Sequence, residues 1–184
     1  MIEKVLFDDT HIVNKLDEMT KSWQQAYKEN IKYLVEIGVA HYYQKQDKEA
    51  LEVFKKLKRL EPTDEDIVAF LGFLFYENQL YFDAIRELNH SLDLNPRQAF
   101  VYFILGNAYS RAGNIKQAVE NYEFAIFLDL DIYTAHMDFA RKYERMGRFE
   151  RAIKEYEYAH EIDPRDEFVS KKIVELTKNL ENTK

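Results

Sequence analysis

The sequence contains no cysteine, which excludes disulfide bonds and thiol chemistry. Glycine and proline are also scarce, at 5 and 3 of 184 residues, and this argues against long disordered linkers. No segment approaches the roughly 18 consecutive apolar residues of a membrane-spanning helix. The apolar part of the opening MIEKVLFDDTH is too short for a signal peptide, so we expect a cytoplasmic protein without a membrane span.

An excess of basic residues is missing as well. Lys and Arg number 26 against 33 Asp and Glu, a net charge of −7, which disfavours a nucleic-acid-binding role. The five histidines lie far apart without a His-x-x-x-His pair, and the glycines occur singly rather than in a phosphate-binding loop. We therefore expect no enzyme activity, no metal and no cofactor.

A repeat of 34 residues runs through most of the chain. Small residues recur at this spacing in two columns: Gly38, Gly72, Gly106 and Ala140, then Ala50, Ala84, Ala118 and Ala152. A bulky column and a closing column keep the same register: Phe54, Leu88, Tyr122 and Tyr156, then Pro62, Pro96, Leu130 and Pro164. The period gives four units, 31–64, 65–98, 99–132 and 133–166. Such a period is typical of a solenoid of stacked helix pairs.

Taken in order, these columns form a series that resembles the tetratricopeptide repeat (TPR): a large residue, then Leu-Gly, Tyr, Ala, Phe, Ala and Pro at fixed offsets. The resemblance covers residues 31–166 and implies an all-α fold, a right-handed superhelix of antiparallel helix pairs. The departures are mild. Leu130 replaces the proline, Ala140 replaces the glycine, and His41 stands where Tyr or Phe is usual.

The spacing predicts the same helices without reference to the family. Within each unit, two sets of apolar residues step by three and four, as one face of a helix does. Small residues such as Gly38 and Ala50 would let the two helices approach closely. The predicted pairs are 31–44 with 47–60, 64–78 with 81–94, 98–112 with 115–128, and 132–146 with 149–162.

The segment 1–30 lacks the repeat columns. After a loose end at residues 1–9, it predicts an amphipathic helix from about Thr10 to Glu29, whose apolar stripe includes Ile12, Val13, Leu16 and Trp23. We place a break at Asn30 and expect this helix to cover the exposed apolar edge of the first unit. Two alternatives remain: an arm that lies in the groove of its own or a second copy, and a helix continuous with the next one.

Residues 167–184 predict a capping helix and a tail. Val169, Ile173, Leu176 and Leu180 share one face of this helix, and Lys and Glu residues occupy the other. Such a helix would cover the apolar face of the last repeat and present a polar face to water.

The TPR resemblance implies that the first helix of each pair lines a concave surface with its fifth, ninth and twelfth residues. The candidate partner-binding residues are therefore Val35, Val39, Tyr42, Ala69, Phe73, Tyr76, Phe103, Asn107, Met137 and Arg141. They are apolar in the first half and increasingly polar in the second. Related domains that hold acidic C-terminal tails carry Lys and Asn where this chain has Val35 and Val39, so we do not expect that specificity.

These features predict a non-catalytic module that binds an apolar peptide or helix of another protein in its groove. One alternative is a chaperone similar to the class II chaperones of type III secretion, although those usually carry three repeats. Another is a structural module that forms a homodimer through its N-terminal helix.

Overall fold

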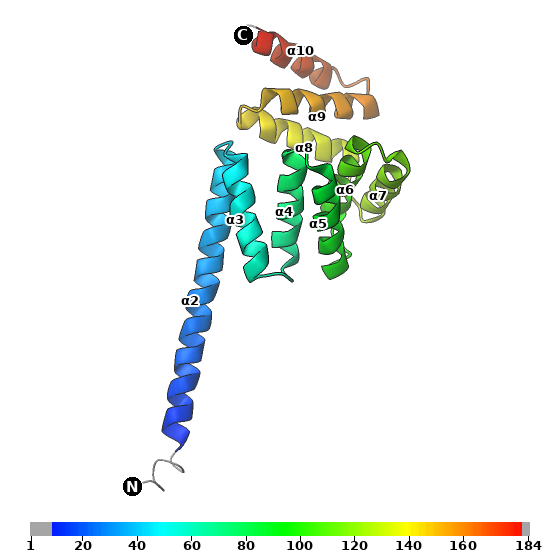
Figure 1. Cartoon of the computed structure of the whole chain (residues 1–184). Helices are drawn as coiled ribbons and strands as arrows, with labels where there is room; N and C mark the ends of the chain where they lie inside the picture. The colour runs from blue at the N-terminus through cyan, green and yellow to red at the C-terminus, as the bar shows by residue number, and fades with distance from the viewer. Residues whose placement is uncertain (1–8, 182–184) are drawn as a thin grey trace, which may run out of the picture.

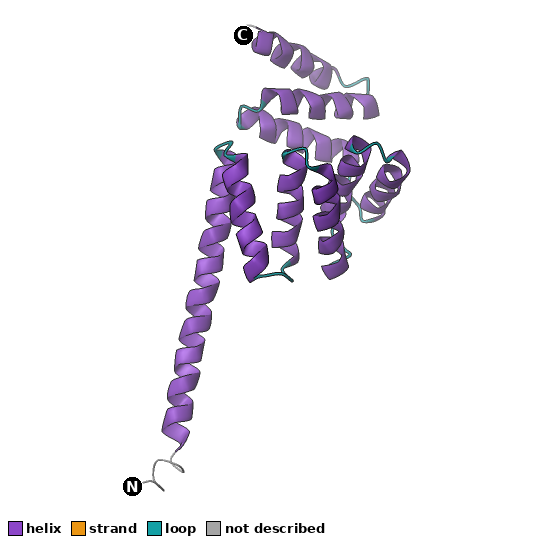
Figure 2. Cartoon of the chain, in the orientation of Figure 1, coloured by secondary structure: helices purple, strands orange, loops and turns teal. Residues whose placement is uncertain are grey.

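The structure is a computed structural model that describes the backbone of residues 9–181 and the side chains of residues 18–181. Figures 1 and 2 show that the described secondary structure is entirely helical, so the predicted all-α solenoid is confirmed. The helices are α2 (Asp9–Tyr43), α3 (Asp47–Leu60), α4 (Glu65–Glu77), α5 (Tyr81–Leu94), α6 (Ala99–Arg111), α7 (Ile115–Phe127), α8 (Ile132–Arg145), α9 (Phe149–Ile162) and α10 (Glu167–Glu181). From α3 to α9, every boundary lies within one residue of its prediction. Residues 1–8 and 182–184, and the side chains of Ile12, Val13 and Leu16, lie outside the described residues.

The first helix of each pair ends in the same turn. Lys45, Gln79, Gly113 and Gly147 follow α2, α4, α6 and α8, and each has a positive φ, between 61° and 80°. In the first of these turns, the Gln46 N–H donates to the His41 carbonyl at 2.9 Å, and the Lys45 N–H donates to the Tyr42 carbonyl at 3.1 Å. This left-handed cap pairs the last carbonyls of the helix and reverses the chain into the second helix.

The column of small residues marks the closest approach of the two helices in a pair. A Cβ atom built on Gly106 would lie 2.7 Å from a ring carbon of Tyr122, and one on Gly38 would lie 2.6 Å from the ring of Phe54. Ala50, Ala84, Ala118 and Ala152 are buried on the facing helices. The bulky column therefore fills the space that the glycines leave open.

The predicted break at Asn30 is wrong, because α2 is a single helix of 35 residues. At about 1.5 Å per residue it is about 50 Å long, and Figure 1 shows it projecting well beyond α3. Its sequence contains no proline, and the first glycine is Gly38, so nothing interrupts the backbone hydrogen bonds near residue 30. Residues 18–30 are all exposed, so this segment does not cover the first unit, and the continuous-helix alternative is correct. We call residues 18–30 the arm.

At the other end, α10 packs on α9. The side chains of Val169 and Leu176 are fully buried there, and Ile173 packs against the same core. Lys172 also ties α10 to α8, because its ammonium lies 2.7 Å from the carboxylate of Glu144.

Proline sets the path of the chain after three of the four units. Glu61, Asn95 and Asp163 precede Pro62, Pro96 and Pro164, with φ of −127°, −142° and −127°. Asn95 and Asp163 have extended backbones, and Glu61, with ψ of 74°, also lies outside the helical region. The proline ring disfavours helical conformations at the preceding residue, so the helical path ends before each of these prolines.

The linker between α7 and α8 has no proline and turns differently. Leu130 replaces the proline, and Asp129 adopts a left-handed backbone with φ of 64°. The Leu130 N–H donates to the Ala125 carbonyl at 3.0 Å, and the Asp129 N–H donates to the Ile126 carbonyl at 2.9 Å. The chain therefore leaves the third unit by the tight turn that elsewhere joins two helices within a unit.

This turn carries α8 away from the stack. Few contacts join α7 to α8, whereas α3 packs on α4 and α5 packs on α6. In Figure 1, α8 and α9 lie crosswise to α4, α5 and α6. On α7 only Ala118 and Ala125 are buried, and Phe127 is 80% exposed. The superhelix is thus interrupted after the third unit, and the fourth unit folds back over the first two.

We expect Leu130→Pro to destabilise the chain by about 1–3 kcal/mol, because it removes the Leu130 N–H bond and disfavours the left-handed backbone at Asp129. Asp129→Gly should be neutral or stabilising, since glycine adopts positive φ readily. Urea unfolding of both variants measures the effect. Leu130→Ala controls for the lost side chain, and a Leu130→Pro variant as stable as Leu130→Ala would contradict this account.

Candidate partner-binding site

A buried carboxylate joins the fourth unit to the first two. Glu77, at the end of α4, is only 5% exposed. It accepts hydrogen bonds from the hydroxyls of Tyr42 on α2, at 3.2 Å, and Tyr143 on α8, at 2.6 Å. Arg151 on α9 forms an ion pair with the same carboxylate and donates to the Glu77 carbonyl at 2.8 Å. Three helices from two distant parts of the sequence thus meet on one side chain.

Arg148 makes a second connection beside the first. Its guanidinium pairs with the carboxylate of Asp47 and donates to the Tyr42 carbonyl at 2.9 Å. It also lies over the ring of Tyr42, 5.0 Å from the centroid. The ammonium of Lys45 donates to the Gly147 carbonyl at 2.9 Å. These contacts bridge about a hundred residues of sequence and bypass the third unit.

The electrostatics of this network follow from its burial. Burial raises the pKa of the Glu77 carboxyl, while the adjacent Arg151 favours the ionised form and acts in the opposite direction. Burial and the neighbouring Glu77 raise the pKa values of the Tyr42 and Tyr143 hydroxyls, which therefore remain protonated donors. Removing the shared acceptor would leave both hydroxyls without a partner.

We expect Glu77→Ala to lower the free energy of unfolding by about 1–3 kcal/mol, the usual cost of leaving a buried donor unpaired. Amide exchange in α8 and α9 should accelerate, because these helices are held to α4 through Glu77. Glu123→Ala, at an exposed position of α7, is the matched control. Equal urea midpoints and exchange rates for the two variants would mean that the network does not hold the fourth unit.

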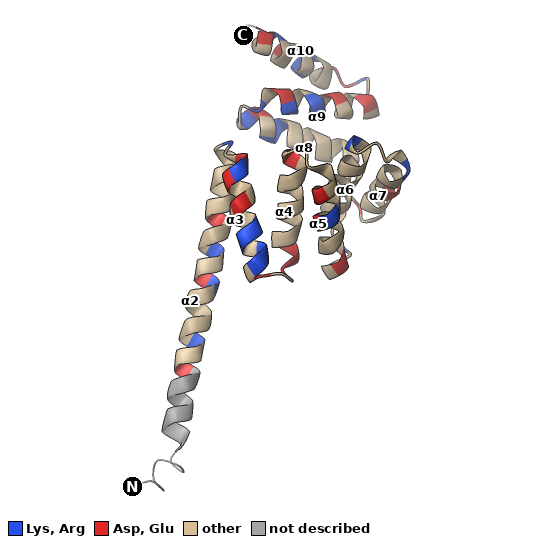
Figure 3. Cartoon of the chain, viewed as in Figure 1, with Lys and Arg blue, Asp and Glu red and all other residues tan. Residues whose placement is uncertain are grey.

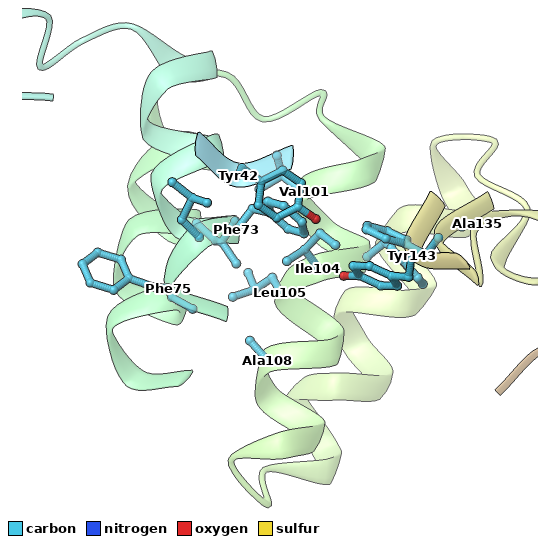
Figure 4. Packing of buried hydrophobic residues seen from close by; sticks show 14 of the residues in the cluster. Tyr42, Phe73, Phe75, Val101, Ile104, Leu105, Ala108, Ala135 and Tyr143 are labelled. Carbon is cyan, nitrogen blue, oxygen red and sulfur yellow. The ribbon is translucent and has the colours of Figure 1, made fainter. Parts of the chain in front are cut away.

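A cavity of about 580 Å³ lies between α4, α6 and α8. Its apolar lining residues are Ala69, Phe70, Phe73, Leu88, Phe100, Val101, Ile104, Leu130, Ala135 and Phe139. Its polar and charged lining residues are Asp66, Gln98, Asp131, Thr134, Asp138 and Lys142. Figure 4 shows Phe73 from α4, Val101 and Ile104 from α6, and Ala135 from α8 in one packed group.

The cavity has an aromatic floor and an open side. Phe139 is central: its ring centroid lies 6.0 Å from those of Phe73 and Phe103, and it stacks on Phe100 at 5.4 Å. Phe73 and Phe139 are buried, whereas Phe100 is 49% exposed and lies where the cavity opens to solvent. An apolar group entering the cavity would therefore meet ring faces that already pack against one another.

The sequence-predicted groove residues are not brought together as a set. Ala69 and Phe73 line the cavity. Tyr42, Phe103 and Met137 are buried within the core, and Val35, Val39 and Tyr76 are partly buried against it. The prediction assumed an open superhelix, but the fourth unit packs against two of these positions: Arg148 contacts Tyr42, and Phe139 contacts Phe103.

The two polar residues of that prediction also lie outside the cavity. Asn107 is buried, and its side-chain oxygen accepts a hydrogen bond from the Tyr122 hydroxyl at 2.6 Å. Arg141 is exposed and pairs loosely with Asp138 at 3.5 Å. It lines a separate shallow depression with Glu144, Arg145 and Phe149.

Sequence reasoning missed most of the cavity residues. Several occupy the second and sixth positions of the first helix in a unit: Asp66, Phe100 and Thr134, then Phe70, Ile104 and Asp138. Bulky apolar residues at Phe70, Phe100 and Ile104 were a usable signal, because the repeat columns do not need them. Phe139 could not be assigned in this way, since its role depends on the direction of α8.

Comparison with known families identifies the repeat. Family models described as tetratricopeptide repeat match residues 33–64, 101–131 and 133–166, more than half of the chain. The chain belongs to the tetratricopeptide repeat family. Proteins of this TPR family bind other proteins, and their repeats are typically non-catalytic, which gives this chain the general character of a protein-binding scaffold.

Solved structures show the same fold. A crystal structure of MamA protein is 24% identical, with 82% of each chain covered and a TM-score of 0.57. The structure designated MamA MSR-1 is 23% identical over 90% of this chain and 99% of that one, with a TM-score of 0.54. A Thermobaculum terrenum O-GlcNAc transferase mutant is 17% identical over 73% of this chain but 26% of its own, with a TM-score of 0.56. No curated protein matches the sequence.

Between residues 9 and 181, no helix combines the length and apolar character needed to cross a membrane. In the same part of the chain, no group of three or more His, Asp or Glu side chains is arranged to hold a metal ion.

Proposed function

We propose that this TPR chain is a non-catalytic adaptor that holds apolar side chains of a partner polypeptide in the cavity between α4, α6 and α8. The observation that carries the proposal is the cavity itself, about 580 Å³ with ten apolar lining residues and an opening to solvent. Pockets that bind small ligands commonly have volumes of about 300–1,000 Å³ and mostly apolar walls, so this cavity is large enough to enclose an apolar group.

The energetics favour an anchored interaction. Phe100 already exposes half of its side chain at the opening, so a partner would cover apolar surface that now faces water. Burying one large apolar side chain typically contributes about 1.5–3 kcal/mol. Because Phe73 and Phe139 are fixed by packing, little ordering of the cavity floor would oppose binding.

The experiment is to isolate a partner of the full chain, purify it, and compare its affinity for three variants. Phe100→Ala removes the aromatic group at the opening and should weaken binding by roughly 2 kcal/mol, as expected for an aromatic anchor. Ala69→Trp fills the cavity and should weaken binding at least as much. Phe82→Ala is the matched control, because Phe82 on α5 is more exposed than Phe100, at 78%, and does not line the cavity.

Each variant is first checked for native helicity and unfolding midpoint. Unchanged affinity in both Phe100→Ala and Ala69→Trp would exclude the cavity as the binding site.

The arm supports a second candidate, self-association. It carries Met19, Trp23 and Tyr27 on one face, and Trp23 is 72% exposed. At the base of the arm, the Tyr27 hydroxyl donates to the Leu60 carbonyl at 3.2 Å. An exposed apolar stripe on an isolated helix is a common protein-contact surface.

If the arm joins two copies, Trp23→Glu should shift the full chain toward monomers, because it places a charge in the apolar contact. Mass in solution over a range of protein concentrations measures this. Gln24→Glu is the control, since it adds the same charge on another side of the same helix. A parent chain that is monomeric at all concentrations would exclude this candidate.

A further inference from the structure

The opening of the cavity is acidic, although its floor is apolar. Three exposed carboxylates belong to its lining: Asp66 in the first turn of α4, Asp131 at the N-cap of α8, and Asp138 on α8. Figure 3 shows acidic residues at the start of α4, and most of the rest of α4 is uncharged. Lys142 is the one cation among the lining residues. We call Asp66, Asp131 and Asp138 the acidic rim.

The protein itself neutralises this rim only in part. Lys142 lies 5.4 Å and 5.5 Å from the ring centroids of Tyr42 and Tyr43, toward α2, where it interacts with their π faces. Asp138 pairs with Arg141 at 3.5 Å, but both side chains are mostly exposed, and such pairs are weak. Among the described residues, no Lys or Arg forms an ion pair with Asp66 or Asp131.

Asp131 is held in its charged form. It begins α8, and its carboxylate accepts hydrogen bonds from the N–H and the hydroxyl of Thr134, at 3.3 Å and 2.8 Å. These bonds lower the pKa of the carboxyl. The charge therefore persists at neutral pH, while the outer side of the carboxylate faces solvent.

We infer that the cavity recognises a cationic amphipathic segment, in which an apolar anchor is flanked by Lys or Arg side chains. This inference rests on the proposed function and names the class of partner. The anchor would occupy the space between Phe73, Phe100 and Phe139, and the flanking cations would meet the acidic rim. Charge complementarity of this kind mainly sets specificity and the rate of association, so binding would weaken as salt rises.

The arm of a second copy fits this chemistry poorly. Along residues 18–30, Lys21 and Lys28 are balanced by Glu18 and Glu29, and Figure 3 shows both signs of charge along α2. An arm docked in the cavity would bring carboxylates toward the rim as often as cations. The charges therefore favour a different partner, one richer in Lys and Arg near its apolar anchor.

The test is a selection of random peptides displayed against the immobilised full chain, without assuming a partner. A parallel selection against Ala69→Trp, or against Phe100→Ala if the first variant does not fold, removes peptides that bind elsewhere. Peptides that need the cavity should be enriched in a large apolar residue flanked by Lys or Arg. Individual peptides are then synthesised and their affinities are measured at low and high salt.

Substitutions in the rim complete the test. Asp66→Asn and Asp138→Asn should each weaken these peptides roughly two- to fivefold and reduce the salt dependence, as expected for exposed charge pairs. Asp93→Asn, which makes the same charge change away from the cavity, should have no effect. Asp131 is left intact because it caps α8.

The outcomes separate the two levels of the proposal. If no selected peptide depends on the cavity, the proposed function fails and this inference falls with it. If cavity-dependent peptides are found but carry neutral or acidic flanks, or resemble the charge-balanced arm, the proposed function stands and this inference is overturned. Equal affinity for the parent, Asp66→Asn and Asp138→Asn chains would overturn it as well.

Discussion

Proline restricts the backbone of the residue before it, and the shape of this molecule depends on the one linker where that proline is missing. Where Pro62 and Pro96 follow the second helix of a pair, the preceding residue leaves the helical conformation and the next pair stacks beside the last. Asp129 is free of this restriction and adopts a left-handed turn. A single substitution in the repeat column, Leu130 for proline, thus accompanies a change in direction of the whole fourth unit.

The position of the fourth unit over the first two depends on polar contacts as well, and these contacts are not part of the repeat columns. Glu77 and Arg148 hold α8 and α9 across the first two units. Buried polar networks often contribute more to the choice of one arrangement than to net stability, because the desolvation of the charges offsets much of their attraction. In this chain the arrangement matters, since α8 supplies Ala135 and Phe139 to the cavity. The cavity is therefore assembled by contacts between distant parts of the sequence.

The difference between local spacing and contacts of distant residues explains what could be predicted from the sequence. Helix boundaries and the close approach at Gly106 follow from local spacing and side-chain size, and both were predictable. The departure at Leu130 was visible, but its consequence depends on a backbone angle that spacing does not give. Positions five, nine and twelve would line an open superhelix. In this structure, where the fourth unit folds back over the first two, Tyr42 and Phe103 are core residues. Phe100 and Phe139 line the cavity instead.

The contacts of Glu77 and Arg148 also bear on how the chain folds. A regular solenoid contains mainly nearest-neighbour interactions, so it can nucleate at any repeat and can unfold from its ends. Here Tyr143 meets Glu77 across 66 residues, and Arg148 meets Asp47 across 101. Such pairs raise the contact order and cannot form until a long loop has closed, which slows folding and couples the first unit to the last. During synthesis, the cavity would remain incomplete until the fourth unit has emerged, so the chain should complete it in one late, cooperative step.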